Sequence, residues 1–162
     1  MTHRITIPDD FPRAISGTKA EDKVKTLGEV QIYLDKAKTQ EELTERIKEA
    51  EVVINIRAYT HLTAEVLASC KNLRLISVWG TGTDNVDLES ARKLGITVTN
   101  TPGANALSVA SRTIAILLAL ARQIPLLDRE VRSGNWPRVE MVQLNGKLLG
   151  LLGLGAIGRH VA

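Results

Sequence analysis

Short apolar stretches alternate with segments of helical periodicity along the first hundred residues. The apolar stretches are rich in Ile, Val and Leu and have the length of strands: they cover residues 4–7, 30–34, 52–56, 73–78 and 97–99. Because strands that alternate with helices form right-handed β-α-β units, this pattern favours a parallel sheet. The sequence therefore predicts an α/β fold.

Two of the intervening helices carry recognisable boundary signals. Thr39 and Glu42 stand three residues apart, as in a capping box, and apolar residues follow on one helix face. Asp87 is a suitable N-cap for a helix that we expect to end at Gly95, since glycine tolerates the left-handed conformation found after helix C-termini.

The pattern changes after residue 100. Residues 101–103 form a Thr-Pro-Gly turn signal, and residues 108–123 then predict a long helix that is apolar nearly all round. A surface helix has one apolar stripe, so we expect this helix to be covered on two sides, by its own domain and by a neighbouring domain or subunit. A core helix of a single domain is the alternative. A shorter helix over residues 126–132 and a buried strand over residues 147–152 are expected to follow.

The expected strand runs directly into the glycine-rich segment Gly153-Leu154-Gly155-Ala156-Ile157-Gly158. In a dinucleotide-binding fold the first glycine makes a tight turn, the second admits the pyrophosphate close to the backbone, and the third lets helix and strand pack closely. Free N–H groups at the start of the helix then face the anion. The acidic residue that contacts the ribose about 20 positions later falls beyond Ala162, so the glycine-rich segment carries this prediction alone.

Composition narrows the classes of function. The 162 residues are 44% hydrophobic and only 3% aromatic, which suits a globular protein with an aliphatic core. The net charge is +3, but basic residues are interspersed with acidic ones, so we expect no nucleic-acid partner. The N-terminus lacks an apolar leader and the longest apolar run, residues 114–121, is too short to span a bilayer, so we expect a cytoplasmic protein without a membrane partner. Cys70 lies in a helical pattern and is expected to be an inert, partly buried thiol.

Four ordered blocks of sequence resemble the D-isomer-specific 2-hydroxyacid dehydrogenases, and most closely the phosphoglycerate dehydrogenase branch of that family. The blocks are residues 55–63 (NIRAYTHLT), 80–87 (GTGTDNVD), 100–105 (NTPGAN) and 145–158, which ends in the glycine-rich segment. The resemblance implies a flavodoxin-like parallel-sheet substrate domain over residues 1–100. It also implies the beginning of a Rossmann NAD-binding domain over residues 101–162, with the substrate held in the cleft between the two domains.

By this resemblance the chain is the N-terminal portion of an oxidoreductase that transfers a hydride between NAD or NADP and a D-2-hydroxy acid or 2-oxo acid. The family's catalytic arginine, glutamate and histidine lie C-terminal to residue 162, so we expect no catalytic residue in this chain and no activity from it alone. Such a histidine has to be held in the correct protonation state, and an adjacent acid raises its basicity. The resemblance further implies a homodimer formed through the long apolar helix.

The resemblance also assigns binding residues. It places Arg57 on a substrate-facing loop. It also implies that the backbone around Trp79, Gly80 and Thr81 binds the substrate carboxylate. Cofactor-contacting positions match Thr81 and the glycine-rich residues Gly153, Gly155, Ala156, Ile157 and Gly158. The residues themselves support this placement, because ligands bind beyond the carboxyl ends of parallel strands, and Asp9, Arg57 and the Gly80 turn each follow a predicted strand.

Simpler roles are the alternatives for several of these residues. Arg57 would then be a surface salt-bridge partner, and residues 80–82 a plain chain reversal. We expect Asp9 and Asp10 to be a loop acid pair rather than a catalytic dyad. Structural or surface roles are expected for the three histidines, His3, His61 and His160.

The chain departs from the family pattern at three places. Ala58 and Tyr59 stand where phosphoglycerate-type relatives often have a hydroxyl and a second cation, which weakens the case for a phosphorylated substrate. Trp79 replaces a smaller residue and predicts a more filled pocket. Ser111 and Arg112 replace an acidic residue and a histidine, and no prediction follows from that change.

Two other functions fit parts of the pattern. A non-catalytic, cofactor-sensing interaction module of the same superfamily would share the glycine-rich segment. A phosphoacceptor receiver domain would also have a parallel flavodoxin-like sheet with acids after its first strand, as at Asp9 and Asp10. It needs an aspartate at the end of its third strand, however, where this chain has Asn55.

Overall fold

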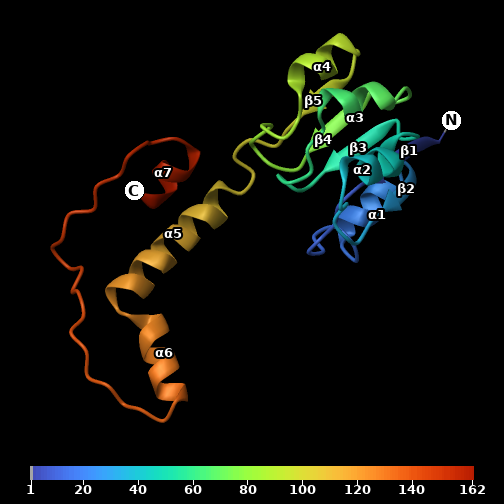
Figure 1. Cartoon of the computed structure of the whole chain (residues 1–162). Helices are drawn as coiled ribbons and strands as arrows, with labels where there is room; N and C mark the ends of the chain where they lie inside the picture. The colour runs from blue at the N-terminus through green and yellow to red at the C-terminus, as the bar shows by residue number, and fades with distance from the viewer. Residues whose placement is uncertain (1) are drawn as a thin grey trace. The chain divides into compact units, whose positions relative to one another are not determined.

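The computed structural model describes residues 2–162, which fold as two compact units that divide after Pro102. The first unit holds the strands and helices α1 to α4, and the second unit, Gly103–Ala162, holds helices α5 to α7 (Figure 1). The whole β-sheet therefore belongs to the first unit.

The first unit is a parallel α/β structure. Its elements are, in chain order, β1 (His3–Ile7), α1 (Lys19–Lys25), β2 (Gly28–Ile32), α2 (Gln40–Ile47), β3 (Val52–Asn55), α3 (Ala64–Ser69), β4 (Leu75–Val78), α4 (Leu88–Lys93) and β5 (Thr97–Thr99). The strands lie in the order β2-β1-β3-β4-β5, and every neighbouring pair is parallel. This order is that of flavodoxin-like folds, so the predicted fold class of the first unit is confirmed.

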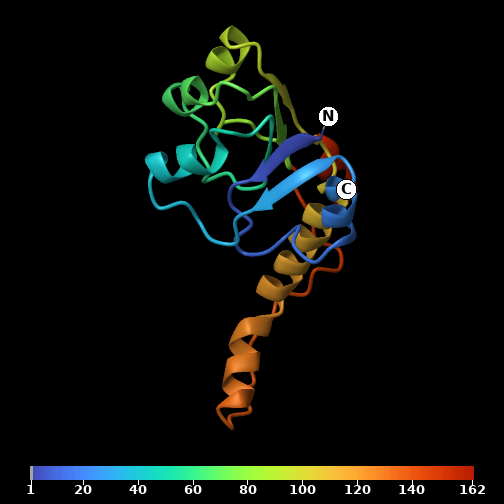
Figure 2. The same cartoon turned by 90° about the vertical axis from the view of Figure 1, so that its right-hand side faces the viewer.

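Helices cover the two faces of this sheet unequally. The connection from β1 to β2 moves toward one edge of the sheet, whereas the connections from β2 to β3, β3 to β4 and β4 to β5 move toward the other edge. Right-handed crossovers therefore place α1 on one face and α2, α3 and α4 on the opposite face (Figure 2). The core lies beneath α2 to α4, where Ile47 and Ile76 have no exposed area. Val53 and Asn55 of β3 point to this core face, because alternate residues of a strand share one side.

The helix boundaries follow the signals in the sequence. Thr39 Oγ1 accepts a hydrogen bond from the Glu42 N–H at 3.2 Å, and Asp87 Oδ1 accepts one at 2.8 Å from the first turn of α4. Glu42 itself accepts from the Lys38 N–H, one residue before the position that the capping box predicts. Gly95 has a φ of 72° just after α4, so the predicted cap and end of this helix are confirmed.

The second unit is helical. Its elements are α5 (Ala106–Ala121), α6 (Ile124–Arg132) and α7 (Ala156–Val161). The first two confirm the helices expected from the apolar pattern, and α7 packs against α5. Within residues 2–162, a single helix with the length and apolar content needed to cross a membrane is not found. The helices α5 and α6 reach these values only when taken together, across a bend of 62°.

The strand expected over residues 147–152 is not formed. This segment is irregular, and Leu148 and Leu152 are fully exposed. A strand needs a neighbour for its N–H and C=O groups, and residues 103–162 contain no other strand that could pair with it. The prediction was wrong because the apolar pattern describes one partner of a pairing and says nothing of the other.

Candidate functional site

A cavity of about 250 Å³ opens at the carboxyl ends of β3 and β4, where ligands bind in open parallel sheets. All of its lining residues belong to the first unit: Asn55, Ile56, Arg57, Ala58, His61, Val78, Trp79, Gly80, Gly82, Asp84 and Asn85. The sequence singled out Arg57, Trp79 and Gly80, and the structure brings these three residues together around one cavity. No binding role was predicted from the sequence for Asn55, His61, Asp84 or Asn85.

The last residues of the two strands meet in this cavity. Asn55 ends β3 and is paired in register with Val78, which ends β4. The Trp79 N–H donates to the Asn55 carbonyl at 2.8 Å and so continues the pairing by one residue. Trp79 is 43% exposed and contributes a large apolar wall to the cavity. That it fills the pocket more than a smaller residue would stays a prediction.

Arg57 brings a positive charge to the cavity. Its Nη2 donates to the Pro12 carbonyl, and its Nε is buried with no hydrogen-bond partner in the described part of the chain. Arg57 forms no ion pair with any carboxylate of residues 2–162. The salt-bridge role considered for Arg57 is therefore not the one that the structure gives it, and its charge is available to an anion.

Two asparagines fix the loop that carries Arg57. Asn85 Nδ2 donates to the Arg57 carbonyl at 3.0 Å and to the Thr60 carbonyl at 2.9 Å. Asn55 Nδ2 donates to the same Thr60 carbonyl at 3.2 Å. Both asparagines were missed from the sequence, although a polar residue that ends an apolar strand, as Asn55 does, is a usable signal.

The Gly80 turn is held by a segment twenty residues further along the chain. The Gly80 carbonyl accepts from the Thr101 N–H at 2.8 Å, and the Thr81 carbonyl accepts from Asn100 Nδ2 at 2.7 Å. The Gly80 N–H donates to the Val78 carbonyl at 3.0 Å and is therefore already engaged. Thr81 lies in the same turn but does not line the cavity.

The two residues after Arg57 differ in where they lie. Ala58 lines the cavity, whereas Tyr59 does not, because its hydroxyl donates to the Phe11 carbonyl. Burial raises the pKa of the Tyr59 hydroxyl, and the negative charge of Asp9 adds to this effect. Tyr59 thus has a packing role and offers the cavity no second cation.

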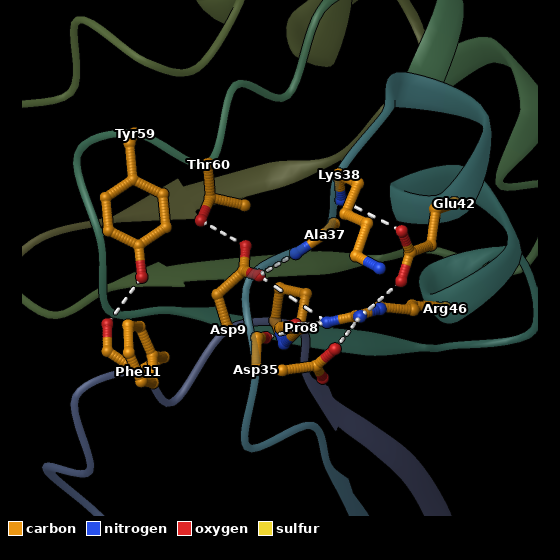
Figure 3. A network of polar contacts seen from close by, with 10 residues as sticks. All are labelled: Pro8, Asp9, Phe11, Asp35, Ala37, Lys38, Glu42, Arg46, Tyr59 and Thr60. Carbon is orange, nitrogen blue, oxygen red and sulfur yellow. Dashed lines mark hydrogen bonds and ion pairs between the residues drawn. The ribbon is translucent and has the colours of Figure 1, made fainter.

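Asp9 is a buried structural acid (Figure 3). Its carboxylate accepts hydrogen bonds from the Ala37 N–H at 2.8 Å and from Thr60 Oγ1 at 2.5 Å. Its Oδ1 also lies 3.6 Å from Nη1 of Arg46, and both side chains are almost fully buried. Every one of these contacts links the end of β1 to neighbouring segments, which supports the expectation that Asp9 is no part of a catalytic dyad.

Asp10 is likewise occupied by its own loop. Its carboxylate accepts from the N–H groups of Ala14 at 2.6 Å, Ile15 at 3.2 Å and Ser16 at 2.9 Å. Burial alone would raise the pKa of Asp10, but the hydrogen bonds from Ser16, Ala14 and Ile15 outweigh it and lower the pKa. Asp10 therefore acts as a loop organiser.

The glycine-rich segment of the second unit has the backbone geometry that close approach requires. Gly153 has a φ of 96°, a region that side-chain-bearing residues rarely adopt. A Cβ on Gly158 would lie 2.1 Å from the Gly153 carbonyl oxygen, so this position has room for glycine alone. Gly155 is the N-cap of α7, and Ala156 and Ile157 form its first turn. These residues fit a bound dinucleotide. The cleft that this segment would share with the Gly80 turn stays a prediction.

Among the remaining titratable candidates, His61 lines the cavity, and the others lie apart from it or are inert. His3 pairs with Glu51 at 3.5 Å on the opposite end of the sheet, and His160 lies on α7. His61 is the one histidine that lines the cavity, and it does so from an exposed position. Cys70 is buried, and burial raises the pKa of its thiol to about 11, which agrees with the inert role expected for it.

Residues 14–142 match the family model described as D-isomer specific 2-hydroxyacid dehydrogenase, catalytic domain. The chain is 43% identical over 137 residues to D-3-phosphoglycerate dehydrogenase of Sus scrofa, covering 83% of this chain and 26% of that protein. It is 40% identical over 144 residues to D-3-phosphoglycerate dehydrogenase of Methanocaldococcus jannaschii, covering 87% and 27%. Hydroxypyruvate reductase of Thermotoga maritima is 40% identical over 125 residues, covering 76% and 40%. The chain thus spans about a quarter of the length of the phosphoglycerate dehydrogenases that it matches.

Solved structures of related enzymes have the same fold. D-lactate dehydrogenase from Aquifex aeolicus, complexed with NAD and lactic acid, matches with a TM-score of 0.75 at 28% identity and covers 98% of this chain and 46% of its own. The acyclic imino acid reductase Bsp5, in complex with NADPH and D-Arg, matches with a TM-score of 0.80 at 26% identity, covering 98% and 51%. Together with the family match over most of the chain, these likenesses place the protein in the D-isomer-specific 2-hydroxyacid dehydrogenase family.

Proposed function

We propose that this chain is the N-terminal portion of a nicotinamide-dependent oxidoreductase that interconverts a D-2-hydroxy acid and its 2-oxo acid. The observation that carries the proposal is the cavity at the strand ends, where the Arg57 charge has no acidic partner. A small carboxylate would supply the missing anion. The cavity volume of about 250 Å³ suits a short acid rather than a large ligand.

The substrate carboxylate would be held jointly by a side chain and by backbone. Arg57 supplies charge and a buried Nε donor. The Gly80 N–H is engaged by the Val78 carbonyl, so we assign to the ligand the N–H group of Gly82, which lines the cavity, and that of Thr81, which precedes it in the same turn. Trp79 would exclude water from one side of the bound acid. In this assignment Thr81 also contacts the cofactor.

The cofactor, NAD or NADP, would be bound by the glycine-rich segment. Its pyrophosphate would lie against the backbone of Gly153 and Gly155 and the N–H groups of Ala156 and Ile157, with Gly158 permitting the tight backbone packing. When bound, the nicotinamide accepts or donates the hydride. The related D-lactate dehydrogenase and imino acid reductase with bound NAD and NADPH support this part of the proposal. Residues 1–100 would form the substrate domain and residues 101–162 the start of the nucleotide-binding domain.

Two alternatives are weaker. A receiver domain uses its acids to bind a metal ion and a phosphoryl group. Here Asp9 is paired with Arg46, and Asp10 accepts hydrogen bonds from backbone N–H groups of its own loop. A cofactor-sensing module would keep the glycine-rich segment without needing a charged substrate cavity. The available charge on Arg57 favours the enzyme.

An NMR titration of the 162-residue chain with D-lactate tests the proposal. We expect saturable shifts in the amides of residues 55–58 and 79–82, and loss of at least tenfold in affinity in Arg57→Met, since a charge-assisted hydrogen bond contributes about 1.5–3 kcal/mol. Arg92→Met is the matched control, because Arg92 is an exposed arginine on α4. Equal loss in both variants, or no binding by the wild-type chain, would reject the substrate site.

The chain alone is expected to show no NADH oxidation with 2-oxo acids. The described residues hold no histidine paired with a carboxylate at the cavity, since the histidine ion pair among residues 2–162 is that of His3 with Glu51. Activity of the purified chain with pyruvate or hydroxypyruvate would contradict this part of the proposal.

A further inference from the structure

The turn at residues 80–82 is not held in shape by side-chain packing around its two glycines. A Cβ on Gly80 would meet nothing within 4 Å, and one on Gly82 would meet only Asp84 Oδ2 at 3.3 Å. Glycine also accepts both signs of φ, so a peptide plane in such a turn can flip over at little steric cost. Hydrogen bonds therefore have to determine which way the peptide groups of this turn face.

Asn100 and Thr101 supply those hydrogen bonds. Asn100 Nδ2 donates to the Thr81 carbonyl at 2.7 Å, and the Thr101 N–H donates to the Gly80 carbonyl at 2.8 Å. Thr101 Oγ1 adds a longer hydrogen bond to the same Gly80 carbonyl at 3.3 Å. The side chain of Asn100 thus fixes one peptide plane of the turn, and the backbone of Thr101 fixes the plane before it.

Holding these two carbonyls also fixes the N–H groups of the same peptide planes. Both peptides are trans, and in a trans peptide the C=O and the N–H point in opposite directions. The Thr81 carbonyl faces Asn100, so the Gly82 N–H points away from Asn100. The Gly80 carbonyl faces Thr101, so the Thr81 N–H points away from Thr101. Residues 2–162 provide no acceptor for either N–H group, and both groups are therefore free to bind a ligand.

Resting on the proposed function, we propose that Asn100 is a positioning residue that directs the Gly82 N–H at the bound carboxylate. Gly82 lines the cavity and Asn100 does not, so Asn100 acts through the turn and not by contact with the ligand. Successive N–H groups of a turn form a site for an anion when they converge on it. A flipped peptide between Thr81 and Gly82 would present a carbonyl oxygen in place of the N–H, and that oxygen would repel a carboxylate. The hydrogen bond from Asn100 opposes this flip.

The first test measures the direction of the Gly82 N–H without any ligand. Residual dipolar couplings of the 162-residue chain report the orientation of each backbone N–H bond. Asn100→Leu nearly keeps the size of the side chain and removes the donor, so we expect the Gly82 coupling to change while those of residues 75–79 stay the same. Asn100→Gln keeps an NH₂ donor and should restore most of the wild-type value. Asn105→Leu is the matched control, since Asn105 is an exposed asparagine whose side chain caps no helix, and it should leave the Gly82 coupling unchanged.

The second test measures the affinity for D-lactate by NMR titration. Asn100→Leu should bind about tenfold more weakly than the wild-type chain, which is the loss expected for one hydrogen bond to a charged group, and Asn100→Gln should recover most of the affinity. The ligand-induced shift of the Gly82 amide should disappear in Asn100→Leu, whereas the shifts of residues 55–58 should persist because Arg57 is unchanged. A general loss of structure would instead weaken all of these shifts together.

An unchanged Gly82 coupling in Asn100→Leu would overturn this inference alone, because other contacts would then hold the peptide. Equal affinities of Asn100→Leu and the wild-type chain would also overturn it, since the Gly82 N–H would then not bind the carboxylate. The same holds for an equal loss of affinity in Asn105→Leu. Failure of the wild-type chain to bind D-lactate would overturn the proposed function, and the role of Asn100 toward the carboxylate with it, while the Gly82 coupling would still decide whether Asn100 orients the turn.

Discussion

Asp9 and Arg46 form a buried ion pair in the first unit, with Oδ1 and Nη1 3.6 Å apart and side chains only 3% and 5% exposed. The Arg46 guanidinium also donates to the Pro8 carbonyl at 2.8 Å and the Asp35 carbonyl at 2.9 Å (Figure 3). Arg46 lies on α2, so this one side chain connects that helix to the end of β1 and to the loop after β2. The loops that border the cavity rest on this connection, because Thr60 donates to Asp9 from the Arg57 loop.

Removal of the Arg46 charge is expected to be strongly destabilising. In Arg46→Met the aliphatic stem is kept, but Asp9 is left as an uncompensated buried charge, which costs about 3–5 kcal/mol. Urea unfolding followed by circular dichroism measures the change. Lys48→Met is the control, since Lys48 pairs with Glu45 on the exposed side of α2 and such pairs contribute little. A stability loss of similar size in the two variants would contradict the role given to Arg46.

Asp10 is expected to contribute to loss of stability in acid. Its pKa in the folded protein lies below the ordinary value of 3.8, so it stabilises the fold above that pH, and the contribution is lost as the pH falls below about 4 through the folded-state pKa. Asp10→Asn should therefore flatten the fall in the free energy of unfolding between about pH 5 and pH 3. An unchanged slope in Asp10→Asn would show that the loop amides do not lower this pKa.

The fold of the first unit and the position of its cavity could be predicted because both depend on local pattern. Alternating strand and helix periods determine the parallel sheet, and the residues that follow strands, Arg57 and Gly80, must then meet at one edge. The prediction of a strand over residues 147–152 was wrong because a strand also needs a second strand to pair with, and residues 103–162 contain none.

Asn55 Oδ1 is buried without a hydrogen-bond partner among residues 2–162, and this too was beyond prediction from the sequence. Its unpaired state depends on where the donors of Asn85 and Thr60 are directed, and those directions are set by loops that have no periodic pattern. The engagement of the Gly80 N–H by the Val78 carbonyl is a further example. Which polar atoms are paired depends on all the residues that meet in the folded cluster, whereas the end of a strand can be located from the local sequence alone.

Cys70 is expected to resist alkylation in the folded chain. Its thiol pKa of about 11 against an ordinary 9.0 corresponds to roughly 100-fold less thiolate at neutral pH, and the thiolate is the nucleophile. Iodoacetamide labelling at pH 8, followed by mass spectrometry, should therefore be about 100-fold slower in buffer than in urea. Labelling at equal rates in the two conditions would show that α3 opens readily.

Gly28 is expected to be required at the start of β2, where it pairs in register with His3 of β1. A Cβ at this position would lie 2.1 Å from the His3 carbonyl oxygen, and that atom cannot move aside like the end of a flexible side chain because it is backbone. Gly28→Ala should therefore lower the free energy of unfolding by about 1–3 kcal/mol, the usual cost of forcing an extra carbon into a packed site.

Gly150→Ala is the matched control, since nothing lies within 4 Å of its Cβ position. Hydrogen exchange locates the effect: the amides of β1 and β2 should lose protection in Gly28→Ala, while those of β4 keep theirs. Full protection of β1 and β2 in this variant would mean that the two strands can separate enough to admit a methyl group, and their pairing would then not be the constraint described here.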